Sequence, residues 1–489
     1  MTTTDGIILA GGRGTRLGPL AAQISKALVS VGNRPQVVNQ ILQLRDAGCE
    51  HVYVVTSPDT NLQVSTAIVR AGLGKYATTV IQKLANGPVH ALLQGLNATY
   101  AQSVLVLFSD TAFTESLPWT GDWVGVSYKY DTKRSWCYLM NNGSYIDGIP
   151  LMNHPVTVGA YRFADVKRAR SVANAVMADV KLTGEIGMAP FLTGYRPEST
   201  YSFTTWTDVG DIFSLAASRH ERFVTRPHHK LRLDSNGLLT KTGVTVEEFQ
   251  FMQLLADREP SVQTLFPTVY DMNINDMSYV MDYIDMPTLA ELWLYWPGLP
   301  ETWQRIIFDL IERLQWSLWK ETGEEHAGKW MATKALSRLT TWTREMGSSV
   351  AIPVKLLADL ADIVGQDITI TGHGDLNFTN IMFSLNTGVF KLVDPRGGDV
   401  PLIYEFAKLG YSHDFACITH GLIDAAGRPL PSRETERKAV NAALHTQYDS
   451  QRLYAAQALI ALAAPPLHNP VEADALYKLG LDYAKRAGL

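Results

Sequence analysis

The sequence predicts an α/β fold for its first half and a different, two-lobed α+β architecture for its second half. Over about the first 225 residues, short apolar runs alternate with amphipathic helical patterns, which is typical of a largely parallel sheet covered by helices. Beyond that point a hairpin and a helix are followed by mostly helical periodicity. The chain has 489 residues, more than one hydrophobic core usually organises. We therefore predict two domains, residues 1–225 and 226–489.

Four apolar runs in the first half are predicted to be buried strands, and two amphipathic segments between them are predicted to be helices. The strands are GIILA (6–10), HVYVVT (51–56), TTVIQ (78–82) and SVLVLFSD (103–110), and the helices are PQVVNQILQLRDAG (35–48) and VHALLQGLNATYA (89–101). Ligands of such sheets gather at the carboxyl ends of the strands. The glycine-rich loop after Ala10 and the acid Asp110 both fall there.

The second half begins with TRPHHK (225–230), where proline and basic residues interrupt the periodicity and predict a linker. KLRLDSNGLLTKTG (230–243) predicts a hairpin that turns at Ser-Asn-Gly, and VTVEEFQFMQLLADRE (244–259) predicts a helix. From about residue 288 the pattern is mostly helical, interrupted by a loop at 371–380 and a strand at 389–395.

Composition argues against several classes of partner. The formal net charge is -5, and no Lys/Arg cluster stands out, so we expect no nucleic-acid partner. The three cysteines are widely spaced and form no CxxC pair, which argues against a disulfide framework or a zinc site and favours a reducing compartment. No stretch approaches 18 uninterrupted apolar residues. We expect a cytoplasmic protein with no membrane partner, and composition does not indicate its oligomeric state.

The first candidate site is the loop after the first strand. Gly11, Gly12 and Gly14 allow backbone N–H groups to approach phosphate oxygens without obstruction by Cβ, and Arg16 and Lys26 add cations for the same anion. The spacing matches neither the P-loop nor the dinucleotide fingerprint, because no GK[ST] closes the loop and no third glycine completes GxGxxG. By itself, such a turn is about as often a tight strand–helix connection as a phosphate site.

The segments LAGGRGTRLGPL (9–20), SKAL (25–28) and GNRPQVVNQIL (32–42) resemble the signature of the nucleotidyltransferases that join a nucleoside triphosphate to a sugar phosphate or to phosphocholine. The resemblance covers residues 5–220 and implies a Rossmann-like domain. It assigns the nucleotide to Gly11, Gly12, Gly14 and Thr15, and catalytic charge neutralisation to Arg16 and Lys26. One departure is Ser25, where the family usually has proline before the lysine.

The same resemblance implies a base-recognition segment, a metal site and an acceptor pocket. Gln82 and Gly87 in QKLANGPVHAL would contact the nucleobase, and a side-chain amide can pair with a pyrimidine edge, so CTP, UTP or dTTP is favoured over a purine nucleotide. Asp110 and Asp208 match the two carboxylates that hold Mg²⁺ in the family, and oxygen ligands suit that ion.

In VGAYRF (158–163), Gly159 lies on the strand that resembles the lining of the acceptor pocket, and Glu185 resembles the acid that the family aims at the acceptor. The usual Glu-Lys-Pro is not evident, because DGIPLMNHP (147–155) stands in its region. The sequence therefore identifies no second phosphate-binding lysine. The chemistry implied is in-line attack of a phosphomonoester oxygen on the α-phosphate, with release of pyrophosphate and without a covalent protein intermediate.

The second candidate site is HGDLNFTNIMF (373–383). Asp375 and Asn380 have the spacing of kinase catalytic loops, and Asp394 follows at the end of a predicted strand. Asp375 would orient or deprotonate a substrate hydroxyl, while Asn380 and Asp394 would hold Mg²⁺ on the phosphates of ATP. An isolated HxD is a weak signal because Asp and Asn are common in loops. The downstream strand-end carboxylate makes it strong.

Residues 228–489 resemble the aminoglycoside phosphotransferase and choline kinase family, which are small-molecule relatives of protein kinases with a bilobal fold. The resemblance implies that Lys241 pairs with ATP phosphates, that Glu248 (or Glu247) anchors this lysine, and that SYVMDYID (278–285) is the hinge that meets adenine. DPRGG (394–398) replaces the DFG of protein kinases and resembles kinases encoded near capsule and surface-polysaccharide genes.

Seven of the eleven tryptophans lie between Trp293 and Trp342. They could form an aromatic cage for a quaternary ammonium group, but their helical spacing favours packing in the core and lid. His373 is, by the same resemblance, a residue that stabilises the loop rather than an acid or base.

Together the two sites predict a bifunctional enzyme that uses ATP and a second nucleoside triphosphate, with Mg²⁺ at both sites. One domain would phosphorylate a small hydroxyl metabolite, and the other would join a nucleoside monophosphate to the product, for surface-polysaccharide precursor synthesis. A sugar is the leading acceptor, and choline or another amino alcohol is the alternative. A third hypothesis is a working transferase fused to an idle kinase-like binding module, which the intact Lys241, Asp375, Asn380 and Asp394 disfavour.

Overall fold

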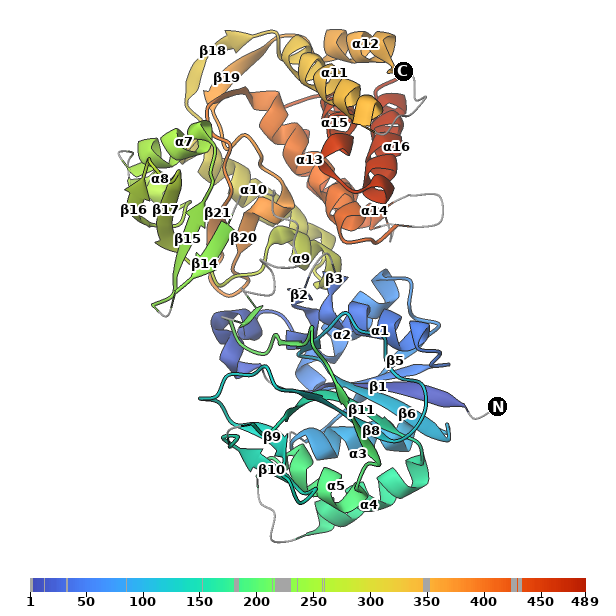
Figure 1. Ribbon diagram of the computed structural model, residues 1–489. Helices are drawn as coiled ribbons and strands as arrows, with labels where there is room; N and C mark the ends of the chain where they lie inside the picture. Colours follow the sequence, from blue (N-terminus) through green and yellow to red (C-terminus); the bar gives the residue numbers. More distant parts are fainter. Residues whose placement is uncertain are drawn as a thin grey trace. The chain divides into compact units, whose positions relative to one another are not determined.

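The computed structural model describes residues 3–489 except 13, 32–33, 85, 152, 180–183, 213, 216–229, 235, 257, 259, 346–351, 424–428 and 430–432. The chain forms two compact units, Met1–Val224 (unit 1) and Thr225–Leu489 (unit 2) (Figure 1). The predicted linker lies outside the described residues, apart from Lys230. Among the described residues, no helix is both long enough and apolar enough to span a membrane.

Unit 1 is built on a parallel β-sheet, as predicted from the alternating apolar runs. The strand order β6-β1-β4-β5 is parallel throughout, and the predicted strands and helices of this region are confirmed. The parallel strands are β1 (Thr4–Ala10), β4 (Val52–Thr56), β5 (Ala77–Ile81) and β6 (Ser103–Phe108), and the helices that cover them include α1 (Gln36–Asp46), α2 (Pro58–Arg70) and α3 (Pro88–Ala98).

The other half of this sheet is largely antiparallel, and of its strands only β11 was expected, from the family resemblance of residues 158–163. Strand β11 (Val156–Phe163), which is buried along its whole length, pairs antiparallel with β6. The sheet continues through four short strands, which are β8 (Trp123–Ser127), β9 (Trp136–Leu139), β10 (Tyr145–Gly148) and β12 (Ser199–Ser202). Strands β9, β10 and β12 have four residues each, too few to show a clear alternation of apolar and polar side chains. Strand β8 has five buried residues, as many residues as the predicted strands β4 and β5, but was missed.

A main core of unit 1 lies on one face of this sheet. Figure 1 shows α3, α4 (Val166–Ala178) and α5 (Met188–Tyr195) together on that face, with α1 and α2 on the opposite one. Side chains of α3, α4 and α5 pack against β6 and β11 in one hydrophobic cluster. The burial holds the carboxyl ends of the strands in place, and the loops that follow those ends carry the candidate site.

Unit 2 begins with a four-stranded antiparallel sheet in the order β14-β15-β17-β16. The predicted hairpin is confirmed, with Lys230 opposite Thr242, although residue 235 of its turn lies outside the described part of the chain. The predicted helix is also confirmed as α7 (Val246–Ala256). The four strands are β14 (Lys230–Leu233), β15 (Leu238–Thr242), β16 (Val269–Asn273) and β17 (Ser278–Asp282).

The rest of unit 2 is mainly helical. Helix α13 (Leu402–Thr419) is buried over nearly all of its length and lies at the centre of this part, with the other helices around it (Figure 1). The surrounding helices are α9 (Leu289–Tyr295), α10 (Pro300–Ser317), α11 (Ala327–Glu345), α12 (Val354–Val364), α14 (Glu434–Leu444), α15 (Ser450–Leu462) and α16 (Pro470–Arg486). The candidate loop follows β19 (Asp367–Thr371) and leads into the hairpin of β20 (Ile381–Phe383) and β21 (Phe390–Leu392).

The tryptophan cluster of unit 2 is largely a packing feature. Trp293 and Trp303 are fully buried, and their ring centroids are 5.0 Å apart. Trp319 is also buried. Trp316 differs, because 77% of its surface is exposed, and for this residue the prediction of packing was wrong. The buried pair supports the core instead of offering free ring faces to a ligand.

Candidate active sites

Two carboxylates meet in unit 1 at the carboxyl end of the parallel sheet. Asp110 follows β6, and Asp208 is the last residue of β13 (Thr207–Asp208). Val209, the residue after Asp208, donates its backbone N–H to the carbonyl oxygen of Asp110 over 2.8 Å. A Cβ atom on Gly210 would lie 2.8 Å from Asp208 Oδ1 and 3.0 Å from Asp110 Oδ2, so both carboxylates border the same point. Burial, and then the charge of Asp110, raise the pKa of Asp208.

This pair of carboxylates has the chemistry of a magnesium site. Mg²⁺ binds oxygen ligands, and in nucleotide enzymes it usually takes one or two carboxylates and completes its shell with phosphate oxygens and water. Among the described residues no group of three or more His, Cys, Asp or Glu side chains could hold a metal. Asp110 and Asp208 are two carboxylates that border one point, as a site completed by phosphate oxygens and water would need.

Two cations neutralise these carboxylates. Lys26 Nζ forms an ion pair with Asp110 Oδ2. The Arg16 guanidinium lies 4.0 Å from Asp110 Oδ2 and 3.9 Å from Asp208 Oδ2, and about half of its side chain is exposed. The structure thus brings together four of the residues predicted from sequence, although they come from three distant segments of the chain.

The glycine loop packs against the predicted base-recognition segment. A Cβ on Gly11 would lie 2.4 Å from Oε1 of Gln82, so only glycine allows that side chain to approach. Gln82 is buried, and its Nε2 lies 3.3 Å from the carbonyl oxygen of Gly87. Gly14 has a φ of 64°, the left-handed region that glycine adopts without strain. Thr15 then begins a 3₁₀ helix, Thr15–Ala22.

A cavity of about 200 Å³ opens beside the two carboxylates. Asp110, Asp208 and Arg16 line one part of it, and Gly159 of β11 lines another. Glu185 is exposed and does not line the cavity. Of the two residues predicted to contact the acceptor, Gly159 therefore lines this cavity and Glu185 does not. The cavity also contains the aromatic residues Phe108, Trp136, Tyr161 and Trp206.

Three charged side chains near this cavity were missed by sequence reasoning. Arg134 bridges Asp208 and Asp211 with N–O distances of 2.7 Å to each, and its guanidinium lies 4.8 Å over the ring of Trp136. Asp147 lines the cavity, and burial raises the pKa of its carboxyl. Asp211 could have been noticed in the repeated acids of TDVGD. Arg134 and Asp147 lie on short strands or loops that carry no motif, so only the fold brings them to the site.

In unit 2, a lysine and two carboxylates from three elements meet. Lys241 Nζ on β15 lies 2.5 Å from Glu248 Oε1 on α7 and also forms an ion pair with Asp394, which follows β21. Tyr279 donates its hydroxyl to the same Glu248 oxygen over 2.6 Å. Burial raises the pKa of Glu248, although Lys241 opposes the rise. Glu247 is exposed, so Glu248 is the partner of the lysine.

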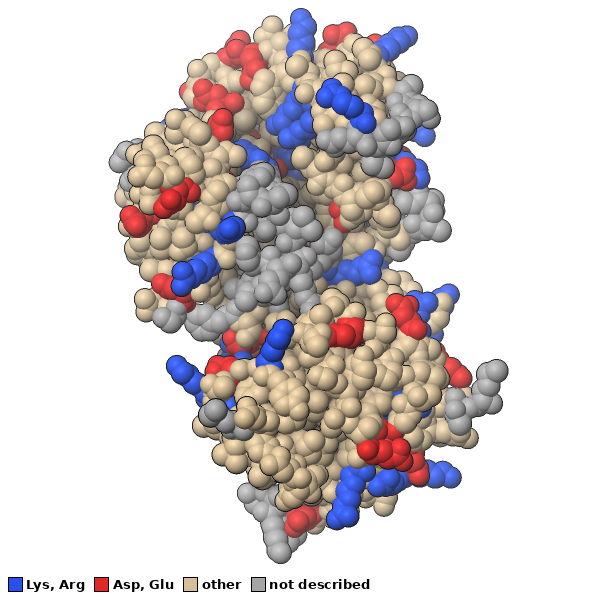
Figure 2. All heavy atoms as spheres, in the orientation of Figure 1, with Lys and Arg blue, Asp and Glu red and all other residues tan. Residues whose placement is uncertain are grey.

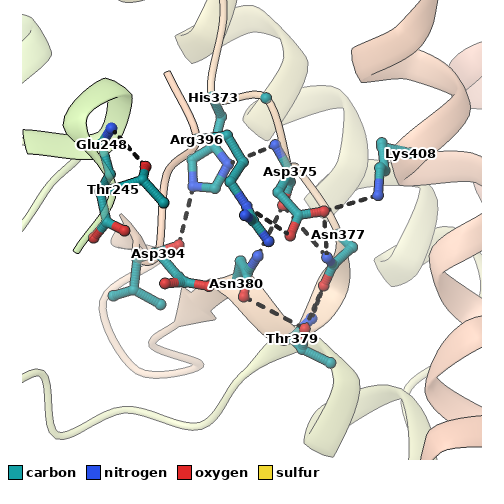
Figure 3. A network of polar contacts seen from close by, with 12 residues as sticks. Thr245, Glu248, His373, Asp375, Asn377, Thr379, Asn380, Asp394, Arg396 and Lys408 are labelled. Carbon is teal, nitrogen blue, oxygen red and sulfur yellow. Dashed lines mark hydrogen bonds and ion pairs between the residues drawn. The ribbon is translucent and has the colours of Figure 1, made fainter. Parts of the chain in front are cut away.

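Asp375 lies at the centre of a polar network in the loop after β19 (Figure 3). Its Oδ1 accepts hydrogen bonds from Lys408 Nζ over 2.8 Å and from Asn377 Nδ2 over 3.2 Å. Asn380 donates its side-chain amide to the backbone carbonyl of Asp375 over 2.9 Å. Asp394, which lies two residues after the end of β21, has a φ of 56°, a left-handed backbone conformation that is uncommon outside glycine.

His373 and a buried glutamate hold this loop in place. His373 Nε2 lies 3.0 Å from the carbonyl oxygen of Val393, and burial lowers the pKa of the imidazole to about 4, so the ring is neutral near pH 7. Glu405, which is fully buried, accepts the backbone N–H groups of His373 and Gly374 over 3.0 Å each. These contacts agree with a positioning role for His373 and add Glu405, which carries no sequence signal.

Lys408 was also missed by sequence reasoning. It lies on α13, far along the chain from Asp375, and only 9% of it is exposed. Burial alone lowers the pKa of a lysine, but the Asp375 carboxylate more than reverses this effect, and the pKa of Lys408 is raised. The lysine is therefore protonated, and it keeps the Asp375 carboxylate oriented by a charge-assisted hydrogen bond.

Comparisons with known proteins address unit 1. Residues 6–118 match the MobA-like NTP transferase domain family. The chain is 33% identical over 109 residues to the glucose-1-phosphate thymidylyltransferase of Mycobacterium tuberculosis, and 46% identical over 52 residues to the mannose-1-phosphate guanyltransferase of Pichia angusta. These matches cover 22% and 11% of this chain, but only 38% and 14% of those relatives. Unit 1 therefore contains a MobA-like NTP transferase domain with sugar-phosphate nucleotidyltransferase relatives.

Two solved structures are each similar to somewhat less than half of this chain. A UDP-glucose pyrophosphorylase complexed with UDP-glucose has 17% sequence identity and a TM-score of 0.37, covering 45% of this chain and 98% of that one. A CTP:phosphocholine cytidylyltransferase from Streptococcus pneumoniae has 14% identity and a TM-score of 0.36, covering 44% of this chain and 98% of that one.

Proposed function

We propose that the protein is a bifunctional enzyme whose two units act in sequence. Unit 2 transfers the γ-phosphoryl group of ATP to a hydroxyl group of a small metabolite, and unit 1 joins a nucleoside monophosphate to the new phosphate and releases pyrophosphate. One observation carries the proposal: each unit pairs a lysine with a strand-end carboxylate from a distant segment. These pairs are Lys26 with Asp110 and Lys241 with Asp394.

In unit 1, a phosphate oxygen of the acceptor attacks the α-phosphorus of the nucleoside triphosphate. A P–O bond forms to the acceptor, and the bond between the α-phosphorus and the bridging oxygen breaks. Lys26 and Arg16 neutralise the charge that develops on the α-phosphate, while the backbone of the glycine loop binds the phosphates. Mg²⁺, which Asp110 and Asp208 would hold, supplies further neutralisation and alignment of the phosphates.

Arg134 supplies a cation for the phosphate of the acceptor. The residue directly precedes Ser135 and Trp136, which both line the cavity, and its guanidinium is already at the Asp208 end of that cavity. A planar guanidinium can bind two phosphate oxygens at once. Arg134 would thus replace the second phosphate-binding lysine, which the sequence does not identify.

In unit 2, Asp375 accepts the proton of the substrate hydroxyl as its oxygen attacks the γ-phosphorus, and ADP leaves. Lys408 holds the carboxylate of Asp375 in position through a hydrogen bond of 2.8 Å. Lys241, anchored by Glu248, pairs with the phosphates of ATP. Asn380 and Asp394 would hold Mg²⁺, which would supply positive charge next to the phosphates of ATP.

We favour a sugar as the acceptor and the synthesis of surface-polysaccharide precursors as the biological role of the enzyme. The cavity of unit 1 combines aromatic rings with the carboxyl of Asp147, so apolar ring faces can pack on the aromatics while hydroxyl groups bond to the acid. A pyrimidine triphosphate is favoured as the donor because the buried Gln82 lies beside the glycine loop.

A phosphorylated amino alcohol, such as phosphocholine, is the second candidate. The ring of Trp136 already receives a cation, since the Arg134 guanidinium lies 4.8 Å over it, and an ammonium group could bind the same ring face. This candidate requires Arg134 to leave Trp136, whereas the sugar does not.

The test is an acceptor panel crossed with five donors. The purified full-length chain is given ATP, Mg²⁺ and either sugars or amino alcohols, and ADP formation is measured. The phosphorylated forms are then supplied with CTP, UTP, dTTP, GTP or ATP, and pyrophosphate release is measured. We expect one acceptor to support both steps. If none of the acceptors supports ADP formation, the protein is a transferase with an idle second unit. If none of the five donors yields pyrophosphate, the proposed role of unit 1 is overturned.

A further inference from the structure

A stripe of cations and aromatic rings borders Asp375 in unit 2. On α11, Trp330, Lys334 and Arg338 follow one another at four-residue steps, and on α13, Tyr404, Lys408 and Tyr411 have steps of four and three. Residues at these spacings share one face of a helix. We call these six residues the cationic–aromatic stripe. The functions assigned so far use Lys408 alone from this set.

Direct contacts join the stripe to Asp375. Lys408 Nζ lies 2.8 Å from Asp375 Oδ1 and 5.7 Å from the ring centre of Tyr404. On the same ring, Lys334 Nζ lies 4.7 Å from the centre and also 3.1 Å from the hydroxyl oxygen. The ring of Trp330 packs edge-on against Tyr404 at 5.1 Å and receives Lys334 at 4.7 Å. One tyrosine ring therefore separates Lys334 from the lysine that binds the proposed base.

The stripe has an excess of positive charge. Lys408 is neutralised by Asp375, but within the described residues no carboxylate forms an ion pair with Lys334 or Arg338. Arg338 donates to the carbonyl oxygen of Ala463 over 3.3 Å. Both side chains are partly exposed. On the face shown in Figure 2, Lys and Arg side chains gather around α11.

We infer that the cationic–aromatic stripe is the acceptor subsite of unit 2 and that its acceptor carries an anionic group, a carboxylate or a phosphate, beside the hydroxyl to be phosphorylated. Lys334 and Arg338 bind the anion, and the hydroxyl points at Asp375. A cationic acceptor group at this place would be repelled by Lys334 and Arg338, which have no carboxylate partner among the described residues. The inference rests on the proposed kinase activity and narrows its acceptor, because it argues against choline as the substrate of this unit.

The phosphoryl transfer at this subsite needs ATP as its only co-substrate. The acceptor oxygen forms a bond to the γ-phosphorus, the bond from that phosphorus to the β–γ bridging oxygen breaks, and ADP leaves with the electron pair. The hydroxyl proton passes to Asp375 and then to solvent. The anionic group of the acceptor takes no part in bond changes, so its loss weakens binding and leaves the chemistry intact.

The experiment compares acceptors that differ in one group. The first series is glycerol, D-glycerate and glycerol 3-phosphate, and the second is glucose, glucuronate and glucose 6-phosphate, with choline and ethanolamine as cationic acceptors. ADP formation by the full-length chain is measured for each. We expect turnover with acidic members and little with their neutral or cationic counterparts. The carboxylate and phosphate members show which anion the site prefers.

Variants assign the effect to the stripe. Lys334→Met should raise KM for the acidic acceptor by about tenfold or more, because a charge-assisted hydrogen bond is lost, with kcat and KM for ATP within about twofold. Lys334→Arg should retain most of the affinity. The matched control is Lys329→Met, which removes an exposed lysine from the same helix and should leave every constant unchanged.

The outcomes separate this inference from the proposed function. Turnover of neutral or cationic acceptors that is insensitive to Lys334→Met would overturn the anionic subsite while leaving the kinase activity intact. If no acceptor yields ADP, the kinase proposal fails, and calorimetric titration with D-glycerate and glycerol 3-phosphate decides the subsite. Binding that is weakened by Lys334→Met and unchanged by Lys329→Met would support it, and equal binding by all three proteins would overturn it.

Discussion

The two units use similar charge pairs but surround them differently. In both, a lysine contacts a carboxylate at the end of a strand, Lys26 with Asp110 and Lys241 with Asp394. In unit 1, the cavity beside the pair contains aromatic rings and the acid Asp147. In unit 2, Asp375 contacts Lys408 and the side-chain amide of Asn377, and Lys408 in turn lies near the rings of Tyr404 and Tyr411. Because of this difference, we expect the two proposed acceptor sites to bind their ligands by different chemistry, and each proposed activity has to be tested separately.

The loops that carry the two sites also differ in what holds them. The loop of unit 1 depends on Gly14, whose φ of 64° is left-handed and where a Cβ would lie 3.1 Å from the Cβ of Lys26. The loop of unit 2 depends on a buried carboxyl, because Glu405 accepts two of its backbone N–H groups. The backbone conformation of a glycine does not change with protonation, whereas the carboxyl group of Glu405 can gain or lose a proton. The two sites should therefore respond differently to pH.

The largest expected effect separates the two chemistries. Asp375→Asn should lower ADP formation by about 10²–10⁴-fold, the usual contribution of a general base, and should leave pyrophosphate release from a supplied phosphorylated acceptor unchanged. Asp208→Asn should have the opposite pattern. Both products are measured for both variants. Loss of both products in either variant would contradict two independent sites.

A second prediction concerns the buried carboxyl of unit 2. Burial raises the pKa of Glu405 from 4.5 to about 7, so between these pH values the folded state binds a proton that the unfolded state does not. This contribution to stability is fully present below about pH 4.5 and is lost as pH rises to about 7, by up to about 3 kcal/mol at 1.36 kcal/mol per pKa unit.

Glu405→Gln should remove this dependence. The measurement is the free energy of unfolding from denaturant titrations between pH 4.5 and 7.5, taken as the difference between wild type and variant at each pH. The subtraction cancels groups such as His373, whose lowered pKa acts in the opposite direction. A difference that does not change with pH would show that Glu405 does not titrate in this range.

A third prediction tests the cation of unit 1. Arg134→Gln should raise KM for the phosphorylated acceptor by about tenfold, because one charge-assisted contact to phosphate is lost. Arg134→Lys should recover part of the affinity, since a lysine keeps the charge without the planar fork. ADP formation by unit 2 should stay unchanged. An unaltered acceptor KM in steady-state pyrophosphate assays would exclude Arg134 from phosphate binding.

The smallest effect is expected at Asp147. Burial raises the pKa of its carboxyl, so the acid is protonated at higher pH than an exposed aspartate, and the ionised form that accepts hydroxyl groups is lost earlier as pH falls. The kcat/KM of unit 1 should therefore decline toward low pH. Asp147→Asn should change kcat/KM by only about threefold near pH 7, as for a neutral hydrogen bond, and should flatten the decline. An unchanged pH profile would remove Asp147 from acceptor binding.

Much of the architecture could be predicted because local patterns coincide with the elements that form. The runs of β1, β4 and β6 are continuous and apolar because those strands are buried on both faces. The helices α1, α3 and α7 follow from their periodicity. The antiparallel strands β9 and β10 could not be found, since they are too short to show a period.

The sequence by itself determined which residue types were available for phosphate chemistry and in which segments they stand: glycines after a strand, an Asp–Asn loop, and lysines and acids at strand ends. Only the tertiary structure decided which of them meet. Arg134, Asp147, Glu405 and Lys408 belong to no motif, and Glu185 lies outside the cavity although a motif pointed to it. The physical reason is that ion pairs and hydrogen bonds act over a few ångströms, a distance that chain folding sets and sequence spacing does not.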